Sequence, residues 1–203
     1  MKKITSWGAA LALLFVFAGC SYAQEPSAAV TAGFSYINSK EGAPGHADIR
    51  GGYIQPAFNL GSGLSVFGDL AFHHGEDRYG SFSLQSYTAG LAKRIAGTPY
   101  GALGWSGEIG SSRISYHQGS GAGLFGTNRV QNGLTFMTAP VFAVSLNPQV
   151  ALTMTPVGLV LRGHAMDPYT SNNADGRVRA GYYAKIGVTV FFGGRGAYGP
   201  GRY

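Results

Sequence analysis

The histidines of this chain are the side chains best suited to hold a metal ion or to sense pH, because imidazole binds transition metals and titrates near neutrality. There are five of them: His46, His73, His74, His117 and His164. His73 and His74 open the stretch HHGED, which adds two carboxylates to the potential ligands. If alternating strands bring distant chain segments to one end of a sheet, the five histidines form a candidate outer-rim cluster. The alternative is that each is a single polar residue at a strand end.

A base and a nucleophile lie close together in the stretch HQGS, at His117 and Ser120. In an extended strand this spacing projects the two side chains to opposite faces, so the imidazole cannot take the proton of the hydroxyl. Glu108 lies upstream and does not restore the geometry. The stretch GAGLFG at 121–126 matches G-x-G-x-x-G, but no helical pattern follows it, so a phosphate-binding loop is not indicated. We therefore expect no catalytic residue and no cofactor.

The first residues of the chain have the pattern of an export signal. Lys2 and Lys3 precede an apolar stretch at 8–18, and small residues at 21 and 23 predict cleavage before Gln24. Cys20 is the only cysteine, so this cleavage leaves no thiol for a disulfide or a metal site. A second interpretation takes FAGC as a lipobox, in which Cys20 is lipidated and becomes the first residue of the mature chain.

The composition allows this chain to cross a bilayer only with strands. Charged residues make up 12% of the chain and 33 residues are glycine, which suits neither a helical bundle nor a disordered polar chain. No apolar run after the first twenty residues is long enough for a transmembrane helix. The basic residues are scattered rather than clustered with aromatics, and together with the export signal this argues against a nucleic-acid partner.

After residue 29, strand-like stretches alternate with breaks rich in Gly, Asn, Pro and Ser, and no helical period persists. The sequence therefore predicts an all-β fold. We expect eight strands, at 30–38, 47–60, 64–74, 81–95, 100–117, 129–146, 149–164 and 177–192. Each is long enough for the roughly 9–11 residues that a tilted membrane strand requires.

The expected connections alternate in length. The second, fourth and sixth are short, at 61–63, 96–99 and 147–149, whereas the other four are longer and polar. The long ones read SKEGAPGH, GEDRYG, QGSGAGLFGTN and AMDPYTSNNADG. This parity is typical of an eight-stranded antiparallel up-and-down transmembrane β-barrel, with short turns in the periplasm and long loops outside.

Apolar and polar residues alternate in the third, fifth and last expected strands, which predicts an apolar outer surface and a polar interior. A soluble barrel with an apolar interior is disfavoured, because several glycines lie on the polar parity. We expect four charged residues to form an interior ion network: Asp69, Glu108, Arg179 and Lys185. An aromatic girdle is expected on the outer surface, from Tyr36, Tyr53, Phe58, Phe72, Tyr100, Trp105, Tyr182 and Phe192.

Two expected strands have a less regular pattern. The fourth, SFSLQSYTAGLAKRI, shows no clean alternation. In the seventh, the apolar residues change parity at Pro156, and a β-bulge there would shift the register and tolerate the missing N–H. The sequence therefore predicts a bulge at Pro156.

The last expected strand ends in KIGVTVFF, which contains Lys185, Gly187, Val190 and Phe192 in a polar-x-Gly-x-x-apolar-x-apolar series. With the export signal, the strand number and the loop parity, it makes residues 30–192 resemble the small OmpA-like or OmpX-like outer-membrane β-barrel proteins of Gram-negative bacteria. The resemblance implies that these four residues are the insertion signal for the barrel assembly machinery. It divides the chain into a signal peptide (1–23), a short segment (24–29), the barrel (30–192) and a flexible Gly-rich periplasmic tail (193–203).

The same resemblance implies a multi-pass protein of the cell outer membrane, in contact with outer-membrane lipid and lipopolysaccharide. The expected function is non-enzymatic: an envelope-structural role, surface interaction through the long loops, or both. The sequence does not identify an extracellular ligand. A narrow channel for small solutes stays open as an alternative. A hydrolase similar to the barrels that deacylate lipid A is disfavoured by the spacing of His117 and Ser120.

Overall fold

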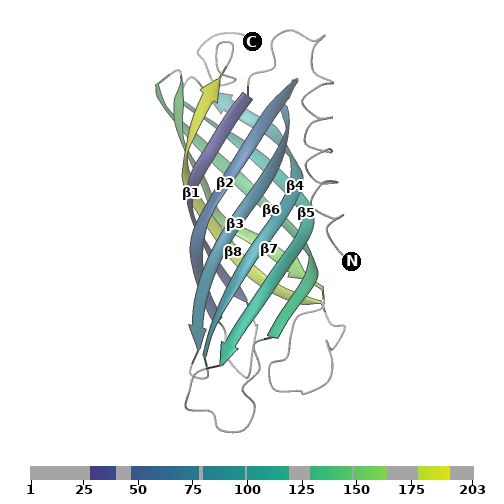
Figure 1. The fold of residues 1–203 in the computed structure, drawn as a ribbon. Helices are drawn as coiled ribbons and strands as arrows, with labels where there is room; N and C mark the ends of the chain where they lie inside the picture. The colour runs from purple at the N-terminus through teal and green to yellow at the C-terminus, as the bar shows by residue number, and fades with distance from the viewer. Residues whose placement is uncertain are drawn as a thin grey trace.

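Eight antiparallel strands, joined in chain order, close into a barrel in which the last strand pairs with the first (Figure 1). The computed structural model describes residues 28–39, 47–77, 80–98, 100–118, 129–147, 149–163 and 178–192. The predicted all-β barrel is confirmed, and each strand begins and ends within a few residues of its expected position. No helix in these ranges is long and apolar enough to cross a membrane.

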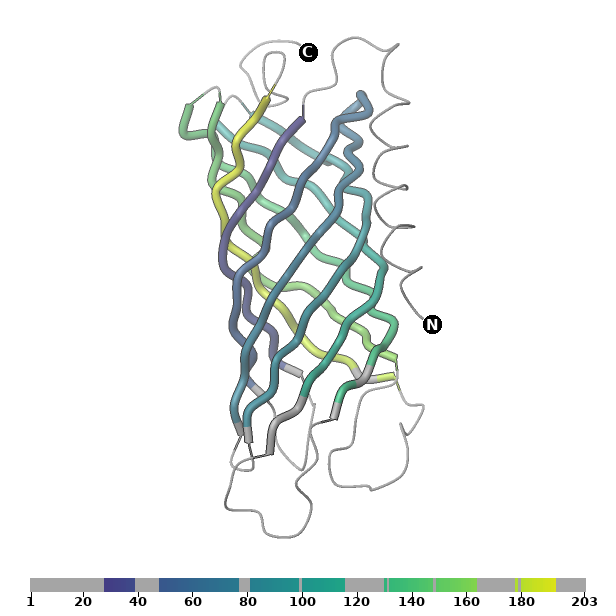
Figure 2. Tube along the Cα trace, in the orientation of Figure 1, coloured from purple at the N-terminus to yellow at the C-terminus, as the bar shows by residue number. Residues whose placement is uncertain are grey.

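The strands alternate in direction along a tilted wall, so their ends lie at two rims (Figure 2). They are β1 (Ala28–Ser39), β2 (Ala47–Gly61), β3 (Leu64–Asp77), β4 (Gly80–Thr98), β5 (Gly101–Gln118), β6 (Arg129–Asn147), β7 (Val150–Arg162) and β8 (Arg179–Phe192). We call the rim at Ser39 and Gln118 the loop rim. The opposite rim, at Ala28 and Phe192, is the turn rim.

The connection between β3 and β4 is shorter than expected. The sequence predicted a long polar loop, GEDRYG, but the ladder between the two strands continues to the pair Asp77 and Gly80. Gly75 pairs with Phe82, whose ring lies 2.5 Å from where a Cβ on Gly75 would be, so the ring packs over the glycine and the hairpin extends. The prediction that GEDRYG forms one of four long loops was therefore wrong. The long connections at the loop rim are 40–46, 119–128 and 164–177.

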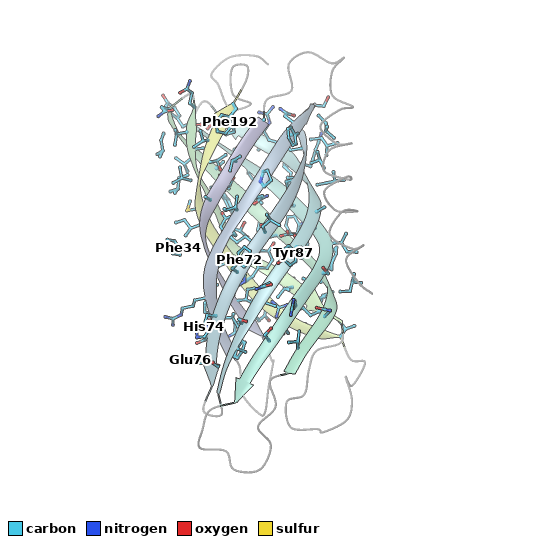
Figure 3. The ribbon with its side chains drawn as sticks, in the orientation of Figure 1. Phe34, Phe72, His74, Glu76, Tyr87 and Phe192 are labelled. Carbon is cyan, nitrogen blue, oxygen red and sulfur yellow. The ribbon has the colours of Figure 1, made fainter. Side chains whose placement is uncertain are left out.

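Large apolar side chains cover the outer surface of the barrel. Phe34, Phe72 and Phe192 lie on this surface (Figure 3), and Phe34 leaves 76% of its area uncovered. The alternation predicted for the third, fifth and last strands is confirmed by the exposure of Phe72, Trp105 and Ile186. A water-soluble protein would bury such residues, so this surface fits a lipid environment.

The β-bulge predicted at Pro156 is confirmed. β7 pairs with β8 in one register as far as Thr155 and in another from Gly158, which leaves Pro156 and Val157 between the two registers. Both of these residues are exposed, whereas Thr155 and Gly158 are buried on the inner side. The extra residue changes the parity that faces inward, and a proline lacks the N–H that a regular ladder would use.

The interior is less uniformly polar than the sequence predicted. β4, where no alternation was evident, sends Phe82, Leu84, Ser86 and Thr88 inward. An apolar cluster lies inside the barrel: Ile37, Ile49, Phe82, Leu84, Met137, Ala139, Val160 and Tyr183. The expectation of a polar interior was wrong at this layer, because an eight-stranded barrel is narrow enough for its own side chains to pack together as a core.

Candidate functional site in the barrel interior

Three charged side chains from three strands meet inside the barrel, and we call them the ion triad. Lys185 on β8 places its Nζ 2.8 Å from Oδ2 of Asp69 on β3 and 3.0 Å from Oε1 of Glu108 on β5. The Asp69 side chain has no exposed surface, and those of Glu108 and Lys185 expose 3% and 8%. Because β8 is not a neighbour of β3 or β5, these contacts connect distant parts of the wall across the interior.

Hydroxyl and aromatic groups surround the ion triad. The Oγ1 of Thr88 donates a hydrogen bond of 2.5 Å to Oε2 of Glu108. The ring centroids of Tyr53 and Tyr183 lie 5.4 and 5.3 Å from the Nζ of Lys185, within the range of cation–π attraction. Two carboxylates share one ammonium group, so its single positive charge lies against both of them. Its loss would leave two buried carboxyl groups without the ammonium group that contacts both.

Gly187 provides the space that the end of the Tyr53 ring occupies beside the triad. Gly33 pairs with Tyr53 on one side and with Gly187 on the other. A Cβ on Gly187 would lie 2.6 Å from the Tyr53 hydroxyl oxygen, so the end of the ring fills the volume of a missing side chain. From the sequence, Tyr53 was expected in the outer girdle, and this was wrong: the residue is only 4% exposed and faces inward. The missed signal is its parity, which it shares with buried Ile49.

A buried arginine was missed in the sequence. Arg162, the last residue of β7, is 2% exposed. The bulge at Pro156 reverses the parity of the strand, so Arg162 faces inward as Gly158 and Val160 do. The parity change at Pro156 is visible in the sequence. Continued to the end of the strand, the new parity places Arg162 on the inner face. The side chain of Arg179, the fourth member of the expected network, lies outside the described residues.

The barrel does not bring His73 and His74 together, because consecutive residues of a strand face opposite sides. His73 faces inward, with its Nε2 2.5 Å from Oγ of Ser35. His74 faces outward, with its Nε2 3.4 Å from Oε1 of Glu76 (Figure 3). These two imidazoles cannot bind one metal ion. The side chains of the other three, His46, His117 and His164, lie outside the described residues. Within the described ranges, no three His, Cys, Asp or Glu residues are grouped to hold a metal.

The contact between Ser35 and His73 joins a hydroxyl to an imidazole, the pair that many hydrolases use. Both residues are 5% exposed and lie on the inner side of the wall. A lipid on the outer surface cannot reach them, so the contact is suited to satisfying two buried polar groups. The side chains of the pair considered from the sequence, His117 and Ser120, lie outside the described residues.

The residues of the KIGVTVFF pattern divide between the two faces of β8. Lys185 belongs to the ion triad, and Gly187 faces inward beneath Tyr53. Val190 and Phe192 are exposed on the outer surface near the turn rim. The proposed insertion signal therefore includes two residues that also organise the interior.

A cavity of about 220 Å³ lies in the half of the barrel near the turn rim. Small residues make up much of its lining: Gly63, Ala92, Ala102, Gly104 and Ala143. Toward the loop rim, the ion triad and the apolar cluster fill the interior, and Ile49 and Leu84 have no exposed surface. These filled layers do not favour a continuous channel through the described barrel.

Comparison with protein-family models and with curated proteins gives no match. Among solved structures, the chain is similar to Neisserial surface protein A (NspA), with 16% identity, a TM-score of 0.62, and coverage of 81% of this chain and 97% of that one. It is similar to Ail, the attachment invasion locus protein of Yersinia pestis, in complex with the heparin analogue sucrose octasulfate (16% identity, TM-score 0.54, coverage 83% and 100%). It is also similar to the outer membrane protein OprG from Pseudomonas aeruginosa (10% identity, TM-score 0.52, coverage 82% and 96%). The chain thus has the fold of the small eight-stranded outer-membrane β-barrel proteins of Gram-negative bacteria, the OmpA-like and OmpX-like group.

Proposed function

We propose that this protein is a non-enzymatic integral barrel of the outer membrane, with an envelope-structural role and surface interaction at the loop rim. The observation that carries the proposal is the distribution of side chains: large apolar residues are exposed outside, and a charged triad is buried inside. That distribution stabilises a barrel in lipid and would make it aggregate in water. The loop rim then faces the cell exterior, and the turn rim faces the periplasm.

The interior supports a structural role better than transport. Asp69 and Glu108 are held by Lys185 rather than lining an open path. Between this triad and the loop rim, the apolar cluster packs inside the barrel together with buried polar residues such as His73 and Arg162. A closed interior of this kind stabilises the wall, so single-channel recordings should show no steady conductance.

Surface interaction would use the connections 40–46, 119–128 and 164–177, which join strands at the loop rim. Their sequences are polar and rich in glycine, serine and asparagine. Two proteins with this fold support such a role by their descriptions, one as a surface protein and one as an attachment protein seen with a heparin analogue. We therefore propose that this rim contacts molecules outside the cell.

Cell fractionation combined with gel mobility tests this function. We expect the protein in the outer-membrane fraction, with an unheated band that migrates differently from the boiled one because the closed barrel resists detergent. A protein found wholly in the periplasm, with no difference between heated and unheated samples, would contradict the proposal.

A further inference from the structure

Arg113 is a charged residue on the outer surface of the barrel. It lies on β5, where Ser112 is buried inside and the residues that share the parity of Arg113, such as Ile109 and Ser111, are exposed. A cation on the lipid-facing side of a barrel is unfavourable in hydrocarbon and is tolerated near the polar boundary of the membrane. Arg113 lies toward the loop rim, near the end of β5 at Gln118. With the loop rim facing the cell exterior, as proposed above, its position matches that of the outer-leaflet headgroups.

The two residues paired directly with Arg113 are polar and uncharged. Cross-strand pairing places Gln85 of β4 on one side of it and Asn132 of β6 on the other. Nearer the loop rim, the pair Ser83 and Ser115 adds two hydroxyl groups. Directly paired side chains in a sheet are close enough to bind one small group together. None of these four neighbours carries a carboxylate that would neutralise the guanidinium.

The surface becomes apolar toward the turn rim. Tyr87 and Leu134 flank Ser111 there, and Ile109 and Phe136 form the next outward pair. The Tyr87 hydroxyl donates to Oε1 of Gln85 at 3.3 Å, which leaves the Gln85 amide nitrogen as a donor. The Tyr87 ring also packs edge-on against Phe72, at 6.5 Å between centroids (Figure 3). A row of donors therefore borders an apolar surface, an arrangement that suits an amphiphile with an anionic head.

A second exposed arginine near the loop rim has a different environment. Arg50 on β2 lies two residues from Asp48, on the same face of the strand. Its cross-strand partner is His74, which contacts Glu76. Two carboxylates therefore lie close to Arg50 along the outer surface. This contrast makes Arg50 a matched control for Arg113, since both arginines are exposed on the outer face of the barrel near the loop rim.

We propose that Arg113, with Gln85 and Asn132, binds a phosphate of an outer-leaflet glycolipid whose acyl chains lie along Tyr87, Ile109 and Phe136. A guanidinium group can donate two parallel N–H bonds to a phosphate, and the two amides add neutral donors beside it. The inference rests on the proposed function, because it requires the loop rim to lie in the outer leaflet. It adds a defined contact with phosphorylated lipid to that function.

Native mass spectrometry of the refolded protein tests this site. The barrel is titrated with bisphosphorylated lipid A and, in parallel, with the same lipid stripped of its phosphates. We expect Arg113→Gln to weaken binding of the phosphorylated lipid about tenfold, as for the loss of a charged hydrogen bond, and Arg50→Gln to change it less than about twofold. The wild type should bind the stripped lipid as weakly as the Arg113→Gln variant does.

Three results would overturn the proposal: equal losses for the two arginine variants, equal binding of the two lipids by the wild type, or displacement of lipid A by millimolar inorganic phosphate. The last would mean that the site takes free phosphate. The comparison of the two lipids uses the wild type alone, so it decides even if Arg113→Gln fails to fold. A heat-modifiable wild type that does not discriminate between the lipids refutes this site only. A wild type that does not form a detergent-resistant barrel refutes the proposed function.

Discussion

The stability of the barrel interior depends on the charge of a single residue, Lys185. It is the counter-ion of both Asp69 and Glu108, and its side chain is only 8% exposed. A surface ion pair contributes little, but removing one partner from a buried group leaves uncompensated charge in a poorly solvated environment. The triad should therefore be intolerant of single substitutions and more tolerant of a neutral replacement of all its members.

Lys185→Met should lower the free energy of unfolding by about 3–5 kcal/mol, measured by urea titration in lipid vesicles. The control is Lys93→Met, which removes an exposed lysine whose Nζ donates to the Ser62 carbonyl oxygen, and we expect a loss of about 1 kcal/mol or less. Neutralising all three members, with Asp69→Asn and Glu108→Gln added, should recover part of the stability. An unchanged midpoint for Lys185→Met would show that the triad does not stabilise the barrel.

Gly187 tests the packing of Tyr53 across β1 against β8. A Cβ at Gly187 would lie 2.6 Å from the Tyr53 hydroxyl and 2.7 Å from the Ala32 carbonyl oxygen, so Gly187→Ala should cost about 1–3 kcal/mol by overpacking. Adding Tyr53→Phe removes the hydroxyl and should recover part of the loss. At Gly107 a Cβ would meet no atom within 4 Å, so Gly107→Ala should unfold like the wild type. Equal destabilisation by the two alanines would contradict this packing.

Strand β7 shows how one extra residue determines which side chains face the interior. Before the bulge, Ala151 and Thr155 face inward; after it, Val160 and Arg162 do. A regular strand would send Arg162 outward into lipid, where an arginine is unfavourable. The bulge therefore allows one strand to present apolar residues to lipid on both sides of Pro156.

Deleting Pro156 should impair assembly, whereas Pro156→Ala should be tolerated. The deletion restores a single parity and turns either the first or the second half of β7 inside out. The substitution keeps the residue count and hence the register. Both variants can be assayed by heat-modifiable mobility of the outer-membrane fraction. A deletion variant that assembles like the wild type would show that the bulge is not needed.

The eight strands and the bulge could be predicted because both depend on local alternation, which a sequence displays directly. The contact of Lys185 with Asp69 and Glu108 followed from parity alone, since inward residues of a narrow barrel must meet. Tyr53 and the β3–β4 hairpin could not be placed as easily. Their positions depend on glycines of other strands. Gly187 of β8 lies under Tyr53 of β2, with β1 between the two strands, and Gly75 of β3 lies under Phe82 of β4, so both placements require the register between strands.

At the scale of the whole molecule, the two halves of the barrel differ. The interior toward the loop rim is packed with the apolar cluster and with buried polar residues such as His73 and Arg162, whereas a cavity of about 220 Å³ lies near the turn rim. The described wall closes without the residues after Phe192, because β8 pairs with β1 through Phe192 and Ala28. The pairing between β8 and β1 alone should therefore be enough to close the barrel.

Deleting residues 193–203 should leave assembly intact, because the ladder between β8 and β1 already ends at Phe192. Outer-membrane recovery and heat-modifiable mobility of the truncated chain should equal those of the full chain. A truncated chain that accumulates unassembled in the periplasm would show that the tail belongs to the insertion signal.

If the apolar outer surface of this barrel contacts lipid, the fluorescence of Trp105 reports that contact directly. Its ring lies on the outer surface, half exposed, with its Nε1 donating to Oγ1 of Thr138 at 2.7 Å. In a Trp7→Phe variant, Trp105 is the only tryptophan, so its fluorescence can be followed in vesicles of brominated lipid. We expect strong quenching by the brominated acyl chains and little quenching by aqueous iodide. Strong quenching by iodide, with none by brominated lipid, would contradict it.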